Sequence, residues 1–229
     1  MKDVAVVVGA GRGIGAATAA RLARDGYAVV IAARTDTDLA RAAAAHPEIT
    51  TVVADAGNES DVERVAEEAV SRGRLAAWVN CAAILERIPF AELDSARWRE
   101  IMRVDLDGVY LCCRTAFRRM SESGGGVIVN LASLSGVANV EKFPGLAAYN
   151  VAKAGVIALS EAVALEGRPS AVRCVCLSPG AVDTELLRKA APHLRPRMTP
   201  EDTAAIIAFL VSDDAAPLSG TNIPIFSNA

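Results

Sequence analysis

Short runs rich in β-branched residues alternate along the chain with longer alanine-rich stretches that have helical spacing. Seven runs predict strands, at residues 4–8, 27–33, 50–54, 75–80, 126–133, 171–178 and 221–226. The stretches between them predict helices, at residues 14–24, 36–45, 59–72, 96–120, 147–166 and 200–211. Because strand and helix alternate, the connections are βαβ crossovers and the sheet is parallel, with helices on both faces. The chain is therefore predicted to have a doubly wound α/β fold.

One domain is expected. The 229 residues are 52% hydrophobic, which is enough apolar surface for a core, and no linker, repeat or charge block divides residues 1–229.

The formal net charge of −3 provides no positive field for nucleic acid or an anionic membrane. The first apolar run, residues 4–8, is too short to span a bilayer and lacks the features of a signal peptide. We expect a cytoplasmic protein with neither nucleic-acid nor membrane partners.

Cysteine and histidine usage limits the chemistry. The five cysteines form no CxxC pair, so neither a disulfide framework nor a metal site is predicted. We expect them to be small buried apolar side chains. His46 and His193 are the only histidines, so the sequence does not favour a Ser-His-Asp hydrolase.

A glycine-rich turn follows the first strand and runs directly into a helix. Glycines let the backbone approach a diphosphate closely, and the free N–H groups and dipole of the helix favour its negative charge. The position between strand and helix predicts a dinucleotide site rather than a turn that needs only flexibility. The residues expected to contact the cofactor here are Gly9, Gly11, Arg12, Gly13, Ile14 and Gly15.

Tyr149 and Lys153 are four positions apart in the predicted helix 147–166, so their side chains share one face. An ammonium about 4 Å from a phenol favours the phenolate by about 4 kcal/mol at an effective dielectric near 20. That energy corresponds to roughly three pKa units. If desolvation costs little, the pKa of Tyr149 falls to about 7 and the phenol becomes a usable acid and base.

Further motifs follow in order: Asp55 after the third strand, Asn80-Cys-Ala-Ala83 after the fourth, Ser133 after the fifth, Tyr149-Asn-Val-Ala-Lys153, and Pro179-Gly180 after the sixth. With the spacing Gly9-x-x-x-Gly13-x-Gly15, this order resembles the short-chain dehydrogenase/reductase family. The resemblance implies a single Rossmann-like domain with a seven-stranded parallel sheet. It also implies an oxidoreductase that transfers hydride between a nicotinamide cofactor and a small-molecule carbonyl or secondary alcohol. Val8, Cys81 and Ala83 depart from the family's usual residues.

The same resemblance assigns roles to individual residues. Tyr149 is implied as the general acid and base, Ser133 as the donor to the substrate oxygen, and Lys153 as the ligand of the cofactor ribose. Ser135 is the nearby candidate for a plain turn hydroxyl. Asp105 stands where the family usually has Asn supporting a water that leads from Lys153 to solvent, and a structural helix residue is the alternative.

The remaining cofactor contacts are also implied by the resemblance. Asp55, with Ala56, falls near the adenine amino group, although a cap for the helix that starts near Asn58 is the alternative. Asn80 is implied to support the sheet centre and the ribose region, with Ala82 contacting through its backbone. The segment implied to hold the nicotinamide carboxamide contributes Pro179, Gly180, Val182 and Thr184.

The end of the second strand bears on the choice of cofactor. A carboxylate there binds the ribose hydroxyls of NAD, whereas the 2′-phosphate of NADP needs cations. The acidic position falls on Ala33, with Arg34 beside it and Arg12 in the glycine loop, which favours NADP(H) over NAD(H). The alternative is that both arginines face solvent and that Asp36 serves NAD.

Two further expectations concern the substrate and the assembly. Residues 85–90 and a lid at about 185–200 are expected to line the substrate pocket, with residues 139–145 at its rim and Phe143, Leu186 and Leu187 as apolar lining. Helices 96–120 and 147–166 are implied to form a homodimer face, with residues 223–226 completing a homotetramer. The alternative function is a non-catalytic NADP(H)-binding redox sensor, which would not need Ser133, Tyr149 and Lys153 together.

Overall fold

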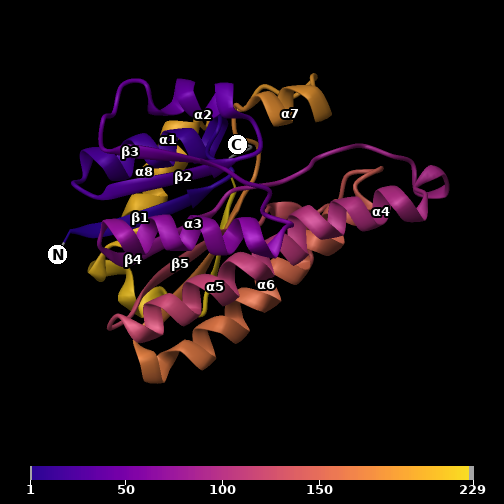
Figure 1. Cartoon of the computed structure of the whole chain (residues 1–229). Helices are drawn as coiled ribbons and strands as arrows, with labels where there is room; N and C mark the ends of the chain where they lie inside the picture. Colours follow the sequence, from indigo (N-terminus) through magenta and orange to yellow (C-terminus); the bar gives the residue numbers. More distant parts are fainter. Residues whose placement is uncertain (1, 227–229) are drawn as a thin grey trace.

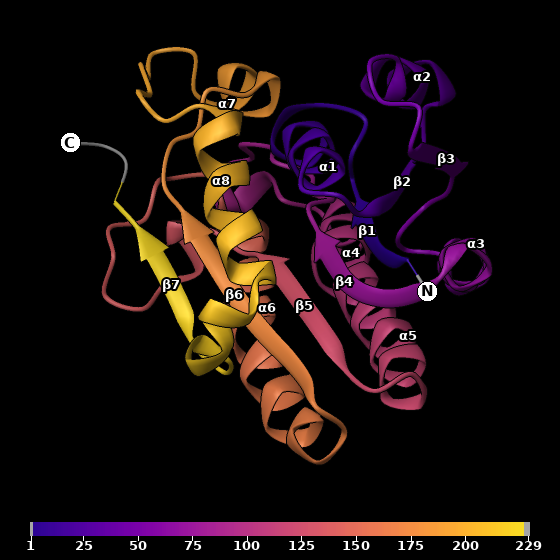
Figure 2. The ribbon, with the colours of Figure 1, turned by 90° about the vertical axis from the view of Figure 1, so that its left-hand side faces the viewer.

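The computed structural model describes residues 2–226, so residues 1 and 227–229 of the predicted domain lie outside the described part. Seven parallel strands form one sheet in the order β3-β2-β1-β4-β5-β6-β7, as Figure 2 shows. The strands are β1 (Asp3–Val8), β2 (Ala28–Ala33), β3 (Ile49–Val53), β4 (Arg74–Asn80), β5 (Gly126–Leu131), β6 (Val172–Pro179) and β7 (Asn222–Ile225). All seven predicted strands are confirmed.

Helices cover both faces of the sheet, so the doubly wound prediction is also confirmed (Figures 1 and 2). Helices α1 and α8 pack together on one face, and α3, α5 and α6 cover the other. The helices are α1 (Gly13–Arg24), α2 (Asp36–Ala43), α3 (Glu59–Arg72), α4 (Ser95–Met102), α5 (Gly108–Glu122), α6 (Ala147–Gly167), α7 (Glu185–Ala190) and α8 (Pro200–Val211).

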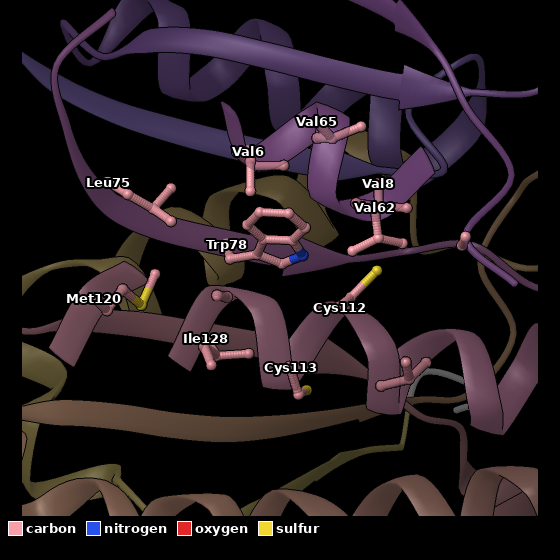
Figure 3. Packing of buried hydrophobic residues seen from close by; sticks show 14 of the residues in the cluster. Val6, Val8, Val62, Val65, Leu75, Trp78, Cys112, Cys113, Met120 and Ile128 are labelled. Carbon is pink, nitrogen blue, oxygen red and sulfur yellow. The ribbon is translucent and has the colours of Figure 1, made fainter. Parts of the chain in front are cut away.

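Each face of the sheet has its own apolar core, because successive strand residues point to opposite faces. Under α3 and α5 the fully buried Trp78 packs among Val6, Val62 and Val65 and the side chains of α5 (Figure 3). On the other face, the buried side chains of α1 and α8 close over β1 and β5. The central strands are therefore buried on both sides, which explains their continuous apolar runs.

The carboxyl ends of β1 and β4 form the topological switch point, where the connections of the sheet leave in opposite directions. Crevices for ligands in doubly wound sheets lie at such points. The short α7 lies beyond the carboxyl end of β6, at this same edge (Figure 2). The fold thus directs the glycine turn, the segment after β4 and the lid segment to one end of the sheet.

One helix prediction is refined. The predicted helix 96–120 is helical throughout, but a π-helical turn at Arg103–Asp107 divides it into α4 and α5. Such turns are frequent at functional sites, and this one directs Asp105 inward to accept a hydrogen bond from the Ile84 N–H. Helix α7 lies within the segment predicted as a lid, and Thr184 caps its start, because its hydroxyl accepts from the Leu187 N–H.

Residues Ala147–Ser170 are long and apolar enough to cross a membrane by length and composition alone. In this structure most of the segment is α6, which packs against β6 and buries Tyr149 and Lys153. Its apolar character therefore has a structural explanation within the described chain.

Candidate active site

The glycine turn after β1 is packed so closely that a side chain at Gly9 or Gly15 would collide with backbone atoms. A Cβ on Gly9, whose φ is +81°, would lie 2.4 Å from the Ala82 nitrogen. A Cβ on Gly15 would lie 2.4 Å from the Gly9 carbonyl oxygen. These glycines therefore bring the turn against the segment after β4 and the start of α1 against the turn.

Helix α1 begins without a cap. Its N-cap residue, Arg12, makes no side-chain cap hydrogen bond, and its first turn has no acidic residue. The N-cap side chains Asn58, Asp94 and Thr199 do cap α3, α4 and α8. The positive end of α1 is thus left available, and this arrangement fits the diphosphate of a dinucleotide.

A cavity of about 210 Å³ lies above this turn. It contains most of the predicted cofactor residues: Gly9, Gly11, Arg12, Gly13, Ile14, Gly15, Arg34, Asp55, Ala56, Ala82 and Thr184. The sequence-based set is therefore brought together from β1, β2, the segments after β3 and β4, and the start of α7.

Asn80 is the exception, because its side chain lies in the core rather than in the cavity. Its Oδ1 accepts from Trp78 Nε1 at 2.9 Å, and its Nδ2 donates to Asn130 Oδ1 at 2.8 Å. Asn130 in turn donates to the Ser160 hydroxyl. Asn80 thus ties β4 to β5 and α6 and supports the sheet centre as expected, and because it lines neither cavity its support of the ribose region stays a prediction.

Asp55 lines the cofactor cavity with its carboxylate held in place. Its Oδ1 accepts from the Gly57 N–H at 2.9 Å, and Arg103 lies 3.1 Å from its Oδ2. Burial raises the pKa of Asp55, but the Gly57 hydrogen bond and the Arg103 guanidinium outweigh burial and lower it below its ordinary value. The cap of α3 is Asn58, so the alternative that Asp55 caps this helix is wrong.

The charged groups near the end of β2 match only part of the arrangement expected for NADP(H), in which Arg34 and Arg12 both serve the cofactor. Arg34 is exposed, lines the cavity and has no carboxylate within ion-pair distance among residues 2–226. Arg12 also lines the cavity, but its guanidinium pairs with Glu185 of α7 at 3.1 Å. The alternative acid, Asp36, does not line the cavity, whereas Asp38 does and pairs with Arg41 at 3.2 Å.

A second cavity, of about 540 Å³, adjoins the first. The two share four lining residues, Ile14, Cys81, Ala83 and Leu186. The larger cavity is lined by six more of the predicted site residues, Ser133, Tyr149, Lys153, Pro179, Gly180 and Val182. Side chains from all three predicted substrate segments also line it, including Leu85, Phe143, Leu186 and Leu187.

Tyr149 and Lys153 lie on one face of α6, as their spacing predicts. The Lys153 Nζ is 5.6 Å from the centre of the Tyr149 ring and donates to the Leu131 carbonyl oxygen at 3.0 Å. Burial raises the pKa of Tyr149, Lys153 lowers it, Asp105 raises it and the Ser133 hydroxyl lowers it. The balance lies above the ordinary value, so the condition for a pKa near 7, a small cost of desolvation, is not met. Desolvation and a second charge outweigh the ammonium.

Ser133 serves the turn and still presents its hydroxyl to the cavity. Its Oγ accepts from the Ser135 N–H at 3.1 Å. The plain turn role expected for the Ser135 hydroxyl thus belongs to Ser133. Because this bond uses an oxygen lone pair, Ser133 can still donate its hydroxyl hydrogen, either to the Tyr149 oxygen or to a carbonyl oxygen of a bound ligand.

Asp105 lines neither cavity but lies behind the reacting pair. Its side chain is 0% exposed, its Oδ1 accepts from the Ile84 N–H at 2.6 Å, and its Oδ2 is 4.0 Å from the Lys153 Nζ. Asp105 therefore lies next to Lys153, but it does not line either cavity.

Sequence reasoning missed several residues of this region. Asp38 and Glu185 line the cofactor cavity, and Cys81 lines both cavities. Asn130, the partner of Asn80, has no motif of its own, although a polar residue in an apolar strand run is a signal that could have identified it.

Comparisons with known proteins cover nearly the whole chain. A family model described as short chain dehydrogenase matches residues 3–195. The cis-4-hydroxycyclohexanecarboxylate dehydrogenase of Sinomonas cyclohexanicum is 38% identical over 97% of this chain and 94% of its own. A cyclohexanol dehydrogenase of Acinetobacter sp. (strain SE19) is 33% identical over 95% of this chain and 91% of its own. A solved 3-ketoacyl-(acyl-carrier-protein) reductase from Brucella melitensis, complexed with NADH, is 31% identical, with a TM-score of 0.88 over 97% of this chain and 96% of that one.

Proposed function

The chain belongs to the short-chain dehydrogenase family, and from this premise we propose that it moves a hydride between NADP(H) and a secondary alcohol or ketone on an apolar ring. It is an oxidoreductase acting on CH–OH groups, as the named dehydrogenases and reductases among its relatives are. The cofactor preference, the catalytic roles and the ring-bearing substrate are the parts proposed here.

One observation carries the proposal: Ser133, Tyr149 and Lys153 line the larger of two adjoining cavities, and the glycine turn lines the smaller. When bound, the nicotinamide cofactor supplies the hydride chemistry. Tyr149 donates the proton to the carbonyl oxygen in reduction and accepts it in oxidation. The Ser133 hydroxyl donates a hydrogen bond to that oxygen as charge develops on it. The Lys153 ammonium would bind the ribose hydroxyls and stabilise the phenolate.

Arg34 supports NADP(H) rather than NAD(H). It is exposed beside the cavity with no ion-pair partner among the described residues, and Ala33 leaves no carboxylate at the end of β2. Its guanidinium is therefore available to pair with a 2′-phosphate. Arg12 is the second cation proposed for this site, although it must first leave Glu185.

The lining of the larger cavity supports the substrate class. Apart from the catalytic residues, most of the lining is apolar, with Leu85, Leu134, Phe143, Leu187 and Leu194 among it. The two relatives named above act, by name, on alcohols of a cyclohexane ring. A carbocyclic secondary alcohol would bury its ring against these side chains and present its oxygen to Tyr149 and Ser133.

An assay of cyclohexanols and cyclohexanones with each cofactor tests the reaction. Tyr149→Phe is expected to lower kcat/KM by about 10²–10⁴-fold with little change in NADPH affinity, because only the proton transfer is removed. Tyr110→Phe is the matched control, since Tyr110 lies on the outer side of α5 and is 46% exposed. Equal rates for wild type and Tyr149→Phe would contradict the catalytic assignment of Tyr149, whereas a wild type that binds NADPH but turns over none of these substrates would favour the redox-sensor alternative.

Cofactor preference is tested by Arg34→Ala. We expect the Kd for NADPH to rise at least tenfold, or about 1.4 kcal/mol, with the Kd for NADH nearly unchanged. Arg24→Ala removes an exposed arginine that does not line the cavity and should leave both constants unchanged. An unchanged NADPH Kd in Arg34→Ala would show that this guanidinium does not hold the phosphate.

A homodimer is also proposed, through the outer faces of α5 and α6. Three side chains on these faces are unusually exposed for apolar residues, namely Tyr110 (46%), Val151 (47%) and Leu165 (61%). Sedimentation of wild type and Leu165→Glu tests this proposal, because a buried charge would weaken the dimer. A wild type that stays monomeric would contradict it.

A further inference from the structure

The Lys153 ammonium is shared among three groups. It is buried, donates to the Leu131 carbonyl oxygen at 3.0 Å, lies 4.0 Å from Asp105 Oδ2 and lies 5.6 Å from the centre of the Tyr149 ring. The nearest opposite charge to this cation is therefore the Asp105 carboxylate. In the chain without ligand, the attraction that Lys153 offers the phenol is divided.

Asp105 is held in its orientation by the π-helical turn at Arg103–Asp107. One carboxylate oxygen accepts from the Ile84 N–H at 2.6 Å, and the other, Oδ2, has no hydrogen-bond partner among the residues that the structure describes. The unpartnered oxygen is the one that lies near Lys153. An amide at this position could keep the Ile84 bond through its oxygen, but it would carry no charge.

No other cation competes for this carboxylate among the described groups around it. Lys153 and Tyr149 approach it from α6, and the Ile84 N–H approaches from the segment after β4, where the thiol of Cys81 also lies near Lys153. Within the π-helical turn, Arg103 pairs with Glu100 and Asp55, and Asp107 is exposed. Neither α4 nor α5, which also pack on the turn, contributes a charged group that acts on Asp105.

We propose that Asp105 is a positioning residue for the proposed reaction: its carboxylate competes with Tyr149 for the Lys153 ammonium, and this competition adds to the burial of the phenol in disfavouring the phenolate. Burial raises the pKa of Asp105 to about 6, so the carboxylate is ionised at neutral pH. In that state it raises the pKa of Tyr149. Carbonyl reduction, which needs the phenol, is retained to higher pH, and alcohol oxidation, which needs the phenolate, is displaced to higher pH. The proposal rests on the catalytic role proposed for Tyr149.

Asp105→Asn tests the inference, since it keeps an oxygen for the Ile84 N–H and removes only the charge. We expect the inflection in kcat/KM for NADP-dependent alcohol oxidation to move to lower pH by about one unit, the low end of the effect of a nearby charge. Asp107→Asn makes the same change on the exposed side of the same turn and should leave the inflection in place. An inflection that stays fixed or moves to higher pH in Asp105→Asn would overturn the proposal.

A second measurement needs no substrate, so its failure is distinct from failure of the proposed function. The phenolate absorbance of Tyr149 is obtained as the difference between each protein and its Tyr149→Phe counterpart during a pH titration. Tyr149 should ionise above its ordinary range in wild type and at lower pH in Asp105→Asn. If Asp105→Asn does not fold, Asp105→Ser replaces it in the same titration, because it also removes the charge, and an unchanged ionisation of Tyr149 in that variant would refute the competition.

Discussion

Gly15→Ala is a direct test of the phosphate site, because the obstruction it creates is made of backbone alone. The added Cβ would lie 2.4 Å from the Gly9 carbonyl oxygen and 2.9 Å from the Ala10 Cα, whereas ordinary contacts begin at 3.4 Å. The start of α1 must therefore move by about 1 Å away from the glycine turn. No side chain can rotate to relieve the contact.

The magnitude follows from this displacement. Overpacking of a closely packed site costs about 1–3 kcal/mol. At roughly 2–4 °C per kcal/mol for a chain of this size, the Tm should fall by roughly 2–12 °C. The same movement withdraws N–H groups of α1 from the diphosphate, and losing one charge-assisted hydrogen bond costs about 1.5–3 kcal/mol. We therefore expect the Kd for NADPH to rise by roughly 10–100-fold.

Titration calorimetry with NADPH and thermal denaturation together separate the two effects. Gly26→Ala is the control: Gly26 has a φ of +98° and no atom within 4 Å of an added Cβ, so only backbone strain is introduced. It should lose about 1 kcal/mol of stability while keeping its NADPH affinity. A folded Gly15→Ala protein that binds NADPH as tightly as wild type does would refute the assignment of this turn to the diphosphate.

Three further predictions concern stability. Asn58→Ala removes the side chain that caps α3 and should lower the free energy of unfolding by about 1 kcal/mol in urea denaturation, whereas no change would show that the cap is dispensable. Trp78→Phe leaves space in a fully buried site and leaves Asn80 Oδ1 without its donor, so a loss of about 2–4 kcal/mol is expected in the same assay, and a loss below about 1 kcal/mol would contradict this. Burial raises the pKa of Asp105 from 3.8 to about 6, so the folded chain binds more protons than the unfolded chain between these values and loses stability as pH rises through them. The stability of wild type minus that of Asp105→Asn should therefore fall by roughly 2 kcal/mol between pH of about 4 and about 6, and a flat difference would show that Asp105 does not titrate there.

The features that could be predicted from the sequence alone depend on residues that are close together along the chain. The β-branched runs predicted all seven strands, because strand propensity and burial on both faces depend on short stretches of chain. The glycine turn and the shared face of Tyr149 and Lys153 followed from turn geometry and from the helical repeat of 3.6 residues. The order of motifs was sufficient to identify the family.

The features that only the tertiary structure decided depend on contacts between residues that are far apart in the sequence. The sequence predicted a lowered pKa for Tyr149, but burial and the Asp105 carboxylate from another element raise it. It placed Asn80 at the sheet centre and the ribose region, but only the fold shows that Trp78 and Asn130 are the partners of its side chain. It proposed Asp36 as the alternative acid, but the orientation of α2 brings Asp38 to the cavity. Desolvation and charge act through space, so their balance at a site depends on which elements the fold packs around it.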